Sequence, residues 1–337
     1  MTAIGTGAAI FGCEGATLGK DEAAFFREFD PLGFIVFARN VDTPEQLRRL
    51  TADLRHAVGR DAMILVDQEG GRVQRLRAPH WREWLPPLDM VERAGAHAAR
   101  AMELRSRIIA KELRAVGIDA NCAPVADIAS RETHAFLRNR CYGDTAPKVT
   151  EIAVAVAHGT LAEGVLPVVK HMPGHGQSTA DTHHNLPTVM ASRDDLAARD
   201  FAPFMALADL PMAMTAHIIF TAYDAVNPAT QSRAVIQMIR QEIGFKGLLL
   251  TDDLNMEALS GTLSERTARS MQAGCDIALH CKGDLAQMIA VAAAAGAMRA
   301  DTLARAQTAL ARRGPPSDDS IAVLDAELLS LIPDAAP

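Results

Sequence analysis

The sequence predicts a (β/α)8 TIM barrel, on the basis of three observations. Eight short apolar runs have the length of buried strands, at residues 8–13, 33–37, 62–66, 120–125, 166–169, 212–216, 247–250 and 276–279. Segments with helical periodicity lie between them, and glycines stand where those helices should end. A chain that alternates strand and helix about eight times is typical of this α/β fold. We therefore expect one barrel domain over residues 1–337, with a tail from about residue 314.

A doubly wound open sheet is the alternative architecture. Dinucleotide binding in such a sheet requires a glycine fingerprint directly after the first strand, and the chain does not have one there. The closed barrel is therefore the preferred fold.

The helix boundaries are marked by residue types that satisfy free backbone groups. Thr43 and Pro44 form a helix start, with Gln46 at capping-box spacing and leucines following at helical intervals. Ser192 and Ser232 repeat the start signal. The predicted stops are glycines, which adopt the left-handed conformation without steric cost: Gly117, Gly164, Gly244 and Gly274. After Arg313, a Gly-Pro-Pro sequence ends the pattern, and the tail is expected to pack as a short helix or to fray.

Composition and charge exclude several classes of partner. The chain is 49% hydrophobic and 22% charged, which is ordinary for a globular protein. Its net charge of −7, without a cluster of Lys and Arg, argues against nucleic acid. No apolar run is long enough to cross a bilayer, and residues 1–11 lack a basic segment, so they predict a first strand and not a signal peptide.

The five cysteines are scattered through the chain and match neither a zinc site nor a disulfide framework: Cys13, Cys122, Cys141, Cys275 and Cys281. We expect small buried thiols in a reducing cytoplasm.

A barrel places its chemistry at the C-terminal ends of its strands. Polar groups follow five of the predicted runs, namely Asp67-Gln68-Glu69, Asp127, Lys170-His171, His217 and Asp252-Asp253. Because these positions are equivalent in a barrel, we expect their side chains to surround one site.

The segment from residue 170 to residue 186 contains a lysine, four histidines, an aspartate and two glycines, without helical or strand periodicity. Long aperiodic loops in compact domains are usually functional. Asp181 and His183 are separated by one residue, and a carboxylate beside imidazole raises its pKa and selects its tautomer. This pair suits a general acid that later acts as a base.

Asp252 follows an apolar strand and lies in a setting with nearby basic groups. A carboxylate there stays ionised and can attack an electrophilic carbon. For Asp253 and Asn255 we favour the role of helix N-cap.

A metal centre is the competing interpretation of the histidines at positions 171, 175, 183, 184 and 217. Imidazole and carboxylate do bind zinc, but the spacing fits no zinc motif and Lys170 would repel a cation. We expect neither metal nor cofactor.

Five polar residues could surround a sugar as donors and acceptors: Asp67, Arg75, Arg140, Lys170 and His171. Taken alone, Arg75 and Arg140 would be interpreted as surface salt bridges.

Four motifs, in this order and at strand ends, resemble bacterial β-N-acetylglucosaminidases (β-hexosaminidases) of glycoside hydrolase family 3, the type with a single domain. They are DQEGGRVQR at 67–75, KHMPGHG at 170–176, DTH at 181–183 and TDDLNM at 251–256, with a looser match around Arg140 in RCYG. The resemblance extends from residues 36–40 to residues 275–276.

This resemblance implies a retaining hydrolysis in which Asp252 forms a covalent glycosyl-enzyme. His183, oriented by Asp181, would protonate the leaving oxygen and then activate water. Asp67, Arg75, Arg140, Lys170 and His171 would hold the sugar. The implied substrate is terminal β-linked N-acetylglucosamine on anhydro-muramic acid, released in the cytoplasm during peptidoglycan recycling. Many family 3 members instead take their acid from a second α/β domain. His280-Cys281, after the eighth strand, departs from the family pattern.

Three alternatives remain open on the sequence. A histidine acid leaves room for phosphate, so a glycoside phosphorylase is the nearest alternative, and rates with and without phosphate would separate the two. A non-catalytic muropeptide-binding barrel is disfavoured because the whole proposed catalytic set is present. A metal-dependent hydrolase would lose activity on chelation. If His183 were structural, Glu69 would be the first candidate for the acid.

Overall fold

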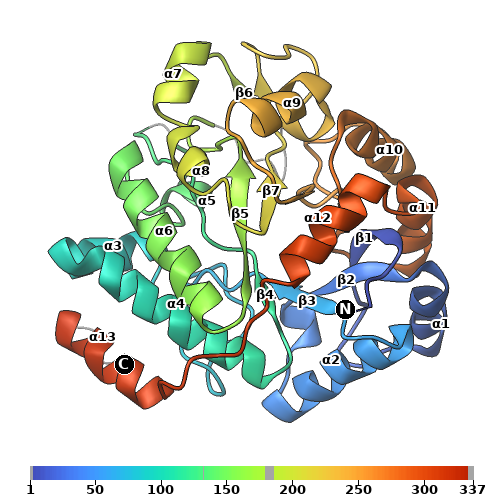
Figure 1. Ribbon diagram of the computed structural model, residues 1–337, viewed down its shortest axis with the longest axis horizontal. Coiled ribbons are helices and arrows are strands. Elements are labelled where there is room, and N and C mark those ends of the chain that lie inside the picture. Colours follow the sequence, from blue (N-terminus) through green and yellow to red (C-terminus); the bar gives the residue numbers. More distant parts are fainter. Residues whose placement is uncertain (1–2, 132, 179–185, 333–337) are drawn as a thin grey trace.

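The eight parallel strands of the main sheet form a barrel. The computed structural model describes residues 3–131, 133–178 and 186–332. The strand order is β10-β1-β2-β3-β4-β5-β7-β9. A parallel bridge between Leu250 and Ile277 joins the two ends, and the Thr251 N–H donates to the Ile277 carbonyl over 3.0 Å. The predicted (β/α)8 fold is confirmed (Figure 1).

The described strands and helices alternate along the chain. The barrel strands are β1 (Gly7–Gly12), β2 (Pro31–Val36), β3 (Met63–Val66), β4 (Ala120–Asn121), β5 (Leu166–Met172), β7 (Met212–Thr215), β9 (Leu248–Leu250) and β10 (Ala278–His280). Two further short strands, β6 (Thr188–Val189) and β8 (Ile219–Phe220), pair with each other. The α-helices are α1 (Lys20–Phe29), α2 (Pro44–Val58), α3 (Pro87–Ala94), α4 (Ala98–Ala115), α5 (Ala135–Arg138), α6 (Ala146–Ala162), α7 (Arg193–Ala198), α8 (Ala202–Ala206), α9 (Arg233–Gln241), α10 (Leu263–Ala273), α11 (Leu285–Ala295), α12 (Ala300–Leu310) and α13 (Ile321–Leu331). Short 3-10 turns are η1 (Ala38–Asn40), η2 (Gly95–His97) and η3 (Ala229–Gln231).

Two strand boundaries differ from the prediction. The fifth strand extends to Met172, so Lys170 and His171 are strand residues and do not follow the strand. The fourth strand covers two residues only, and Val125 then makes an isolated parallel bridge to Lys170. Periodicity misses the end of the fifth strand because its side chains change from apolar to polar where the strand reaches the site. It overextends the fourth strand because residues 122–125 stay apolar, although Pro124 among them has no N–H for a strand ladder.

The predicted helix starts are confirmed by side-chain caps. Thr43, Ser192 and Ser232 each accept a hydrogen bond from a backbone N–H three residues later. The predicted capping box was wrong. The Gln46 side chain accepts a hydrogen bond from the Asp42 N–H over 2.9 Å and not from the N–H of the N-cap, Thr43. The four predicted stop glycines all have φ between 71° and 117°, at Gly117, Gly164, Gly244 and Gly274.

The core has two layers, because successive side chains of a strand face opposite sides. Residues such as Leu166 and Val168 pack inside the barrel with their counterparts from the other strands. Val169, the residue after Val168, faces the opposite side and packs outward against the helices. The same alternation determines which polar side chains at the strand ends face the barrel interior.

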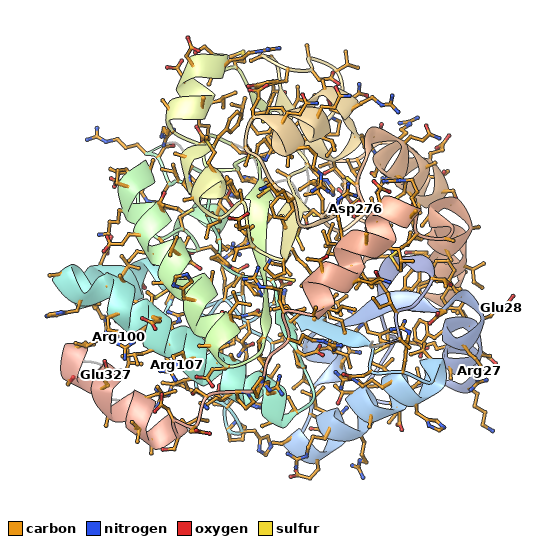
Figure 2. The ribbon with its side chains drawn as sticks, viewed as in Figure 1. Arg27, Glu28, Arg100, Arg107, Asp276 and Glu327 are labelled. Carbon is orange, nitrogen blue, oxygen red and sulfur yellow. The ribbon has the colours of Figure 1, made fainter. Side chains whose placement is uncertain are left out.

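The C-terminal tail forms α13, which lies against α4 at the edge of the molecule (Figure 1). Arg82 holds Asp325 with two bonds of 2.6 and 2.7 Å. Arg100 of α4 and Glu327 of α13 form a second pair at 2.7 Å, and Figure 2 shows them at the junction of the two helices. Of the two outcomes expected for the tail, packing as a short helix is therefore the one observed.

The cysteines agree with the prediction of small buried residues, since all five are free thiols and Cys281 alone among them is half-buried. Within the described residues, no helix has the length and apolar character needed to cross a membrane.

Candidate active site

Strand alternation directs three charged side chains into the open end of the barrel. Asp67, Lys170 and Asp252 each stand two residues beyond an inward-facing apolar residue, respectively Leu65, Val168 and Leu250. Their side chains therefore face the same interior as those residues, at the C-terminal ends of the strands. This places groups far apart in the sequence around one cavity.

Lys170 is the centre of an ion network in this cavity. Its Nζ lies 2.8 Å from Asp67 Oδ1 and 2.6 Å from Glu69 Oε1. Arg75 Nη2 holds the other oxygen of Asp67 at 3.0 Å. Burial alone would raise the pKa of Asp67, but Lys170 and Arg75 outweigh it and hold that pKa well below its usual range. The two cations thus fix an ionised acceptor for a sugar hydroxyl.

Glu69 connects this network to Arg140. The guanidinium donates through Nε to Oε2 over 2.9 Å and through Nη2 to Oε1 over 2.8 Å. Burial opposes ionisation of the carboxyl, yet Arg140 and Lys170 lower the pKa of Glu69 to about 2. A carboxyl that is held ionised by two cations is a poor proton donor, which removes Glu69 as the reserve candidate for the acid. Arg140 is buried with it, so the surface interpretation of this arginine was wrong.

His171 is oriented by Asp127. The His171 Nδ1 lies 2.7 Å from Asp127 Oδ2, and the backbone N–H groups of His171 and His175 donate to Asp127 Oδ1. Because a carboxylate accepts, Nδ1 bears the proton, and Nε2 lies 3.5 Å from Arg140 Nη2 at the cavity. Burial raises the pKa of Asp127, but the His171 ring lowers that pKa by more, so the net direction is down.

Sequence reasoning assigned no role to Glu69 in binding or to Asp127. Their signal was present, since Glu69 stands two residues after Asp67 and Asp127 follows the fourth predicted strand. What the sequence lacked was the pairing of each carboxylate with its cation or ring across the barrel.

Asp252 lies at the same cavity and is half-buried among polar neighbours. Burial raises its pKa, whereas the His217 and His171 rings, the Asp253 N–H and Lys170 lower it, and the net direction is down. The Asp253 N–H donates to its Oδ1 over 2.8 Å. Among the described residues, no Lys or Arg lies within salt-bridge distance of Asp252, in contrast to Asp67 and Glu69. Its carboxylate is thus ionised without a cation that would have to be displaced.

The cavity has a volume of about 170 Å³. Three cations and three carboxylates face it, and its remaining wall is mainly apolar, with Phe37, Val73, Leu137, Met214, Met256 and Leu279. The guanidinium carbon of Arg75 lies 5.2 Å from the centre of the Phe37 ring. All five predicted sugar-binding residues and Asp252 line this cavity, so the structure brings together six of the eight predicted site residues.

The other two, Asp181 and His183, lie outside the described residues, as does His184. Asp253 differs from its predicted role, because no helix begins there. Its Oδ1 accepts from the N–H groups of Asn255 at 3.2 Å and Cys281 at 3.1 Å, which joins the loops after β9 and β10. The N-cap prediction for Asp253 and Asn255 was therefore wrong.

The described residues do not support the metal interpretation of His217. Its Nδ1 lies 2.8 Å from Thr230 Oγ1 and its Nε2 lies 3.0 Å from the Asp253 carbonyl, so both nitrogens are engaged. No group of three His, Cys, Asp or Glu that could hold a metal occurs in residues 3–131, 133–178 and 186–332.

A Glu69→Gln variant tests the structural role of this carboxylate. We expect the Michaelis constant to rise and the protein to lose about 3 kcal/mol of stability, because Lys170 and Arg140 would be left with too little buried negative charge. Steady-state kinetics and denaturant unfolding check this. The rate loss should be similar for aryl glycosides with good and poor leaving groups, and a loss confined to poor leaving groups would restore Glu69 as the acid.

Comparisons with known proteins show which family the chain belongs to. A model of the glycosyl hydrolase family 3 N-terminal domain matches residues 23–312. The chain belongs to glycosyl hydrolase family 3. It is a glycoside hydrolase, which sets aside the non-catalytic barrel. A β-hexosaminidase of Methylococcus capsulatus is 36% identical over 277 residues, covering 81% of this chain and 82% of that protein. One from Pseudomonas aeruginosa is 35% identical over 286 residues, covering 83% of each.

Solved structures of family 3 proteins are similar to this chain. NagZ from Neisseria gonorrhoeae, in complex with N-trifluoroacetyl-D-glucosamine, has a TM-score of 0.86 and 28% identity and covers 100% of both chains. A family 3 β-N-acetylglucosaminidase from Paenibacillus also has a TM-score of 0.86, with 29% identity, covering 96% of this chain and 67% of that one.

Proposed function

We propose that this chain is a retaining exo-β-N-acetylglucosaminidase with Asp252 as its nucleophile. The observation that supports this most directly is the contrast between the cavity carboxylates. Asp67 and Glu69 are neutralised by cations, while Asp252 is ionised without a Lys or Arg partner among the described residues, as attack on an anomeric carbon requires.

The dimensions and polarity of the cavity support an exo mode of action. Its volume of about 170 Å³ is small for a binding site and suits one sugar ring better than a chain. Asp67, Lys170 and His171 offer fixed acceptors and donors for sugar hydroxyls, and Arg75 and Arg140 hold them in place. The β-hexosaminidase relatives, and the N-trifluoroacetyl-D-glucosamine complex of the Neisseria protein, favour an N-acetylated hexosamine.

The acid/base in this proposal is His183, oriented by Asp181. Retaining glycosidases generally use two carboxylates, so a histidine acid departs from the general rule. Two proton transfers need catalysis: the glycosidic oxygen takes a proton as the leaving group departs, and the incoming water loses one when it hydrolyses the glycosyl-enzyme. One imidazole performs both steps in turn.

The finer proposal is that the natural substrate is N-acetylglucosamine linked to anhydro-muramic acid, cleaved in the cytoplasm during peptidoglycan recycling. Five free thiols support a reducing compartment. The proposed partners are small glycans alone, without metal, cofactor, nucleic acid or membrane.

The test compares p-nitrophenyl N-acetyl-β-D-glucosaminide with the corresponding glucoside, each with and without phosphate. We expect cleavage of the N-acetylated substrate to be faster, independent of phosphate, and to yield the free sugar with retained configuration. Phosphate-dependent rates with a sugar 1-phosphate product would instead establish a phosphorylase. Preference for the glucoside would contradict the proposed substrate class.

A further inference from the structure

His217 and Thr230 form a buried pair directly behind the proposed nucleophile. His217 follows β7, and the outward alternation of that strand turns its side chain away from the cavity, toward η3, which contains Thr230. Both residues are fully buried. Neither residue lines the cavity.

A hydrogen bond of His217 reaches the backbone of Asp253, the residue whose N–H binds Asp252. His217 Nε2 lies 3.0 Å from the Asp253 carbonyl oxygen, which can only accept, so Nε2 bears a proton and donates it. The N–H of the same residue, Asp253, donates to Asp252 Oδ1 over 2.8 Å. The imidazole thus anchors the residue whose N–H orients the nucleophile.

Thr230 fixes the ring of His217 in that orientation. Its Oγ1 lies 2.8 Å from His217 Nδ1, 2.8 Å from Thr215 Oγ1 and 3.0 Å from the Ala216 carbonyl. When Nδ1 is bare, the Thr230 hydroxyl donates to it. When Nδ1 is protonated, the hydroxyl accepts from it and turns its own hydrogen to the Ala216 carbonyl. The ring therefore keeps both hydrogen bonds, and its donation to Asp253, in either protonation state.

We propose that His217 and Thr230 are positioning residues that hold the Asp252 carboxylate in its attacking orientation through the backbone of Asp253. The inference rests on the proposed function, because it takes Asp252 as the nucleophile. A nucleophile displaced by a fraction of an ångström loses much of its rate without losing substrate affinity, since Asp67, Lys170 and His171 bind the sugar independently.

The chain offers a matched pair of variants for the test. Thr230→Val removes the hydroxyl that contacts His217 with little change in volume, and Thr230→Ser retains it. Thr215→Val is the control, because Thr215 is equally buried and contacts Thr230 but forms no hydrogen bond with His217 in the part of the chain that the structure describes. His217→Gln keeps an N–H donor for the Asp253 carbonyl, whereas His217→Leu does not.

The measurement is the rate at which a mechanism-based fluorosugar labels the protein, together with kcat and KM on p-nitrophenyl N-acetyl-β-D-glucosaminide. We expect Thr230→Val to slow labelling and lower kcat by about 10- to 100-fold with KM nearly unchanged. The labelling rate and kcat of Thr230→Ser and Thr215→Val should stay close to those of the parent protein. Both quantities should be higher for His217→Gln than for His217→Leu.

Two results would overturn the inference in distinguishable ways. Equal labelling rates for Thr230→Val and Thr215→Val, with Asp252 labelled in both, would refute the positioning role alone. Labelling of another residue in the unmodified protein would refute Asp252 as the nucleophile and the inference with it. If His217→Leu does not fold, the threonine variants still decide the question.

Discussion

Replacing Asp252 by Ala should lower kcat by about 10⁴-fold or more, because a methyl group cannot form the covalent glycosyl-enzyme. The side chain is half-buried at the cavity, and its removal takes no direct partner from the Asp67–Lys170–Glu69 network. KM should therefore change far less than kcat. Pre-steady-state release of p-nitrophenol should show no burst in the variant.

Asp253→Asn is the matched control for this experiment. Its side chain accepts from the Asn255 and Cys281 N–H groups and has no role in the proposed chemistry, and an amide oxygen can still accept both bonds. We expect a loss of less than about 10-fold. Mass spectrometry after fluorosugar treatment should locate the label on Asp252. A label on Asp253 would identify Asp253 as the nucleophile instead.

Replacing His183 by Ala should slow glycosylation by about 10²- to 10⁴-fold on a natural disaccharide, whose leaving alcohol needs a proton. A nitrophenolate leaves with little help, so the loss on an activated aryl glycoside should be only about 10-fold. Deglycosylation loses its base in both cases, and the covalent intermediate should accumulate. Rapid-quench mass spectrometry measures that intermediate directly.

Two further variants calibrate the His183 result. The glycosylation rate of Asp181→Ala should lie between those of His183→Ala and the parent protein, because the imidazole remains but loses its orienting carboxylate and part of its raised pKa. His184→Ala changes the adjacent imidazole, to which no role is assigned, and should be nearly neutral. Equal losses on good and poor leaving groups, without accumulated intermediate, would show that His183 is structural.

The sequence alone determined the barrel and most of the catalytic end. Eight apolar runs and four helix-ending glycines depend on local backbone preferences, and these need no knowledge of distant contacts. The period of two in β3, β5 and β9 likewise extends to Asp67, Lys170 and Asp252, so their common direction follows from the strand pattern once the strand ends are known.

Only the tertiary structure decided how the charges are distributed among these groups. Glu69 is a partner of Arg140 and Lys170 and not an acid, and Asp127 sets the tautomer of His171. Asp253 joins two loops instead of capping a helix, and His217 is engaged through both nitrogens. Each role depends on a partner distant in the sequence that the closure of the barrel brings within hydrogen-bond distance. A local pattern identifies a titratable side chain, but the side chain's protonation and role are set by neighbours that only the fold supplies.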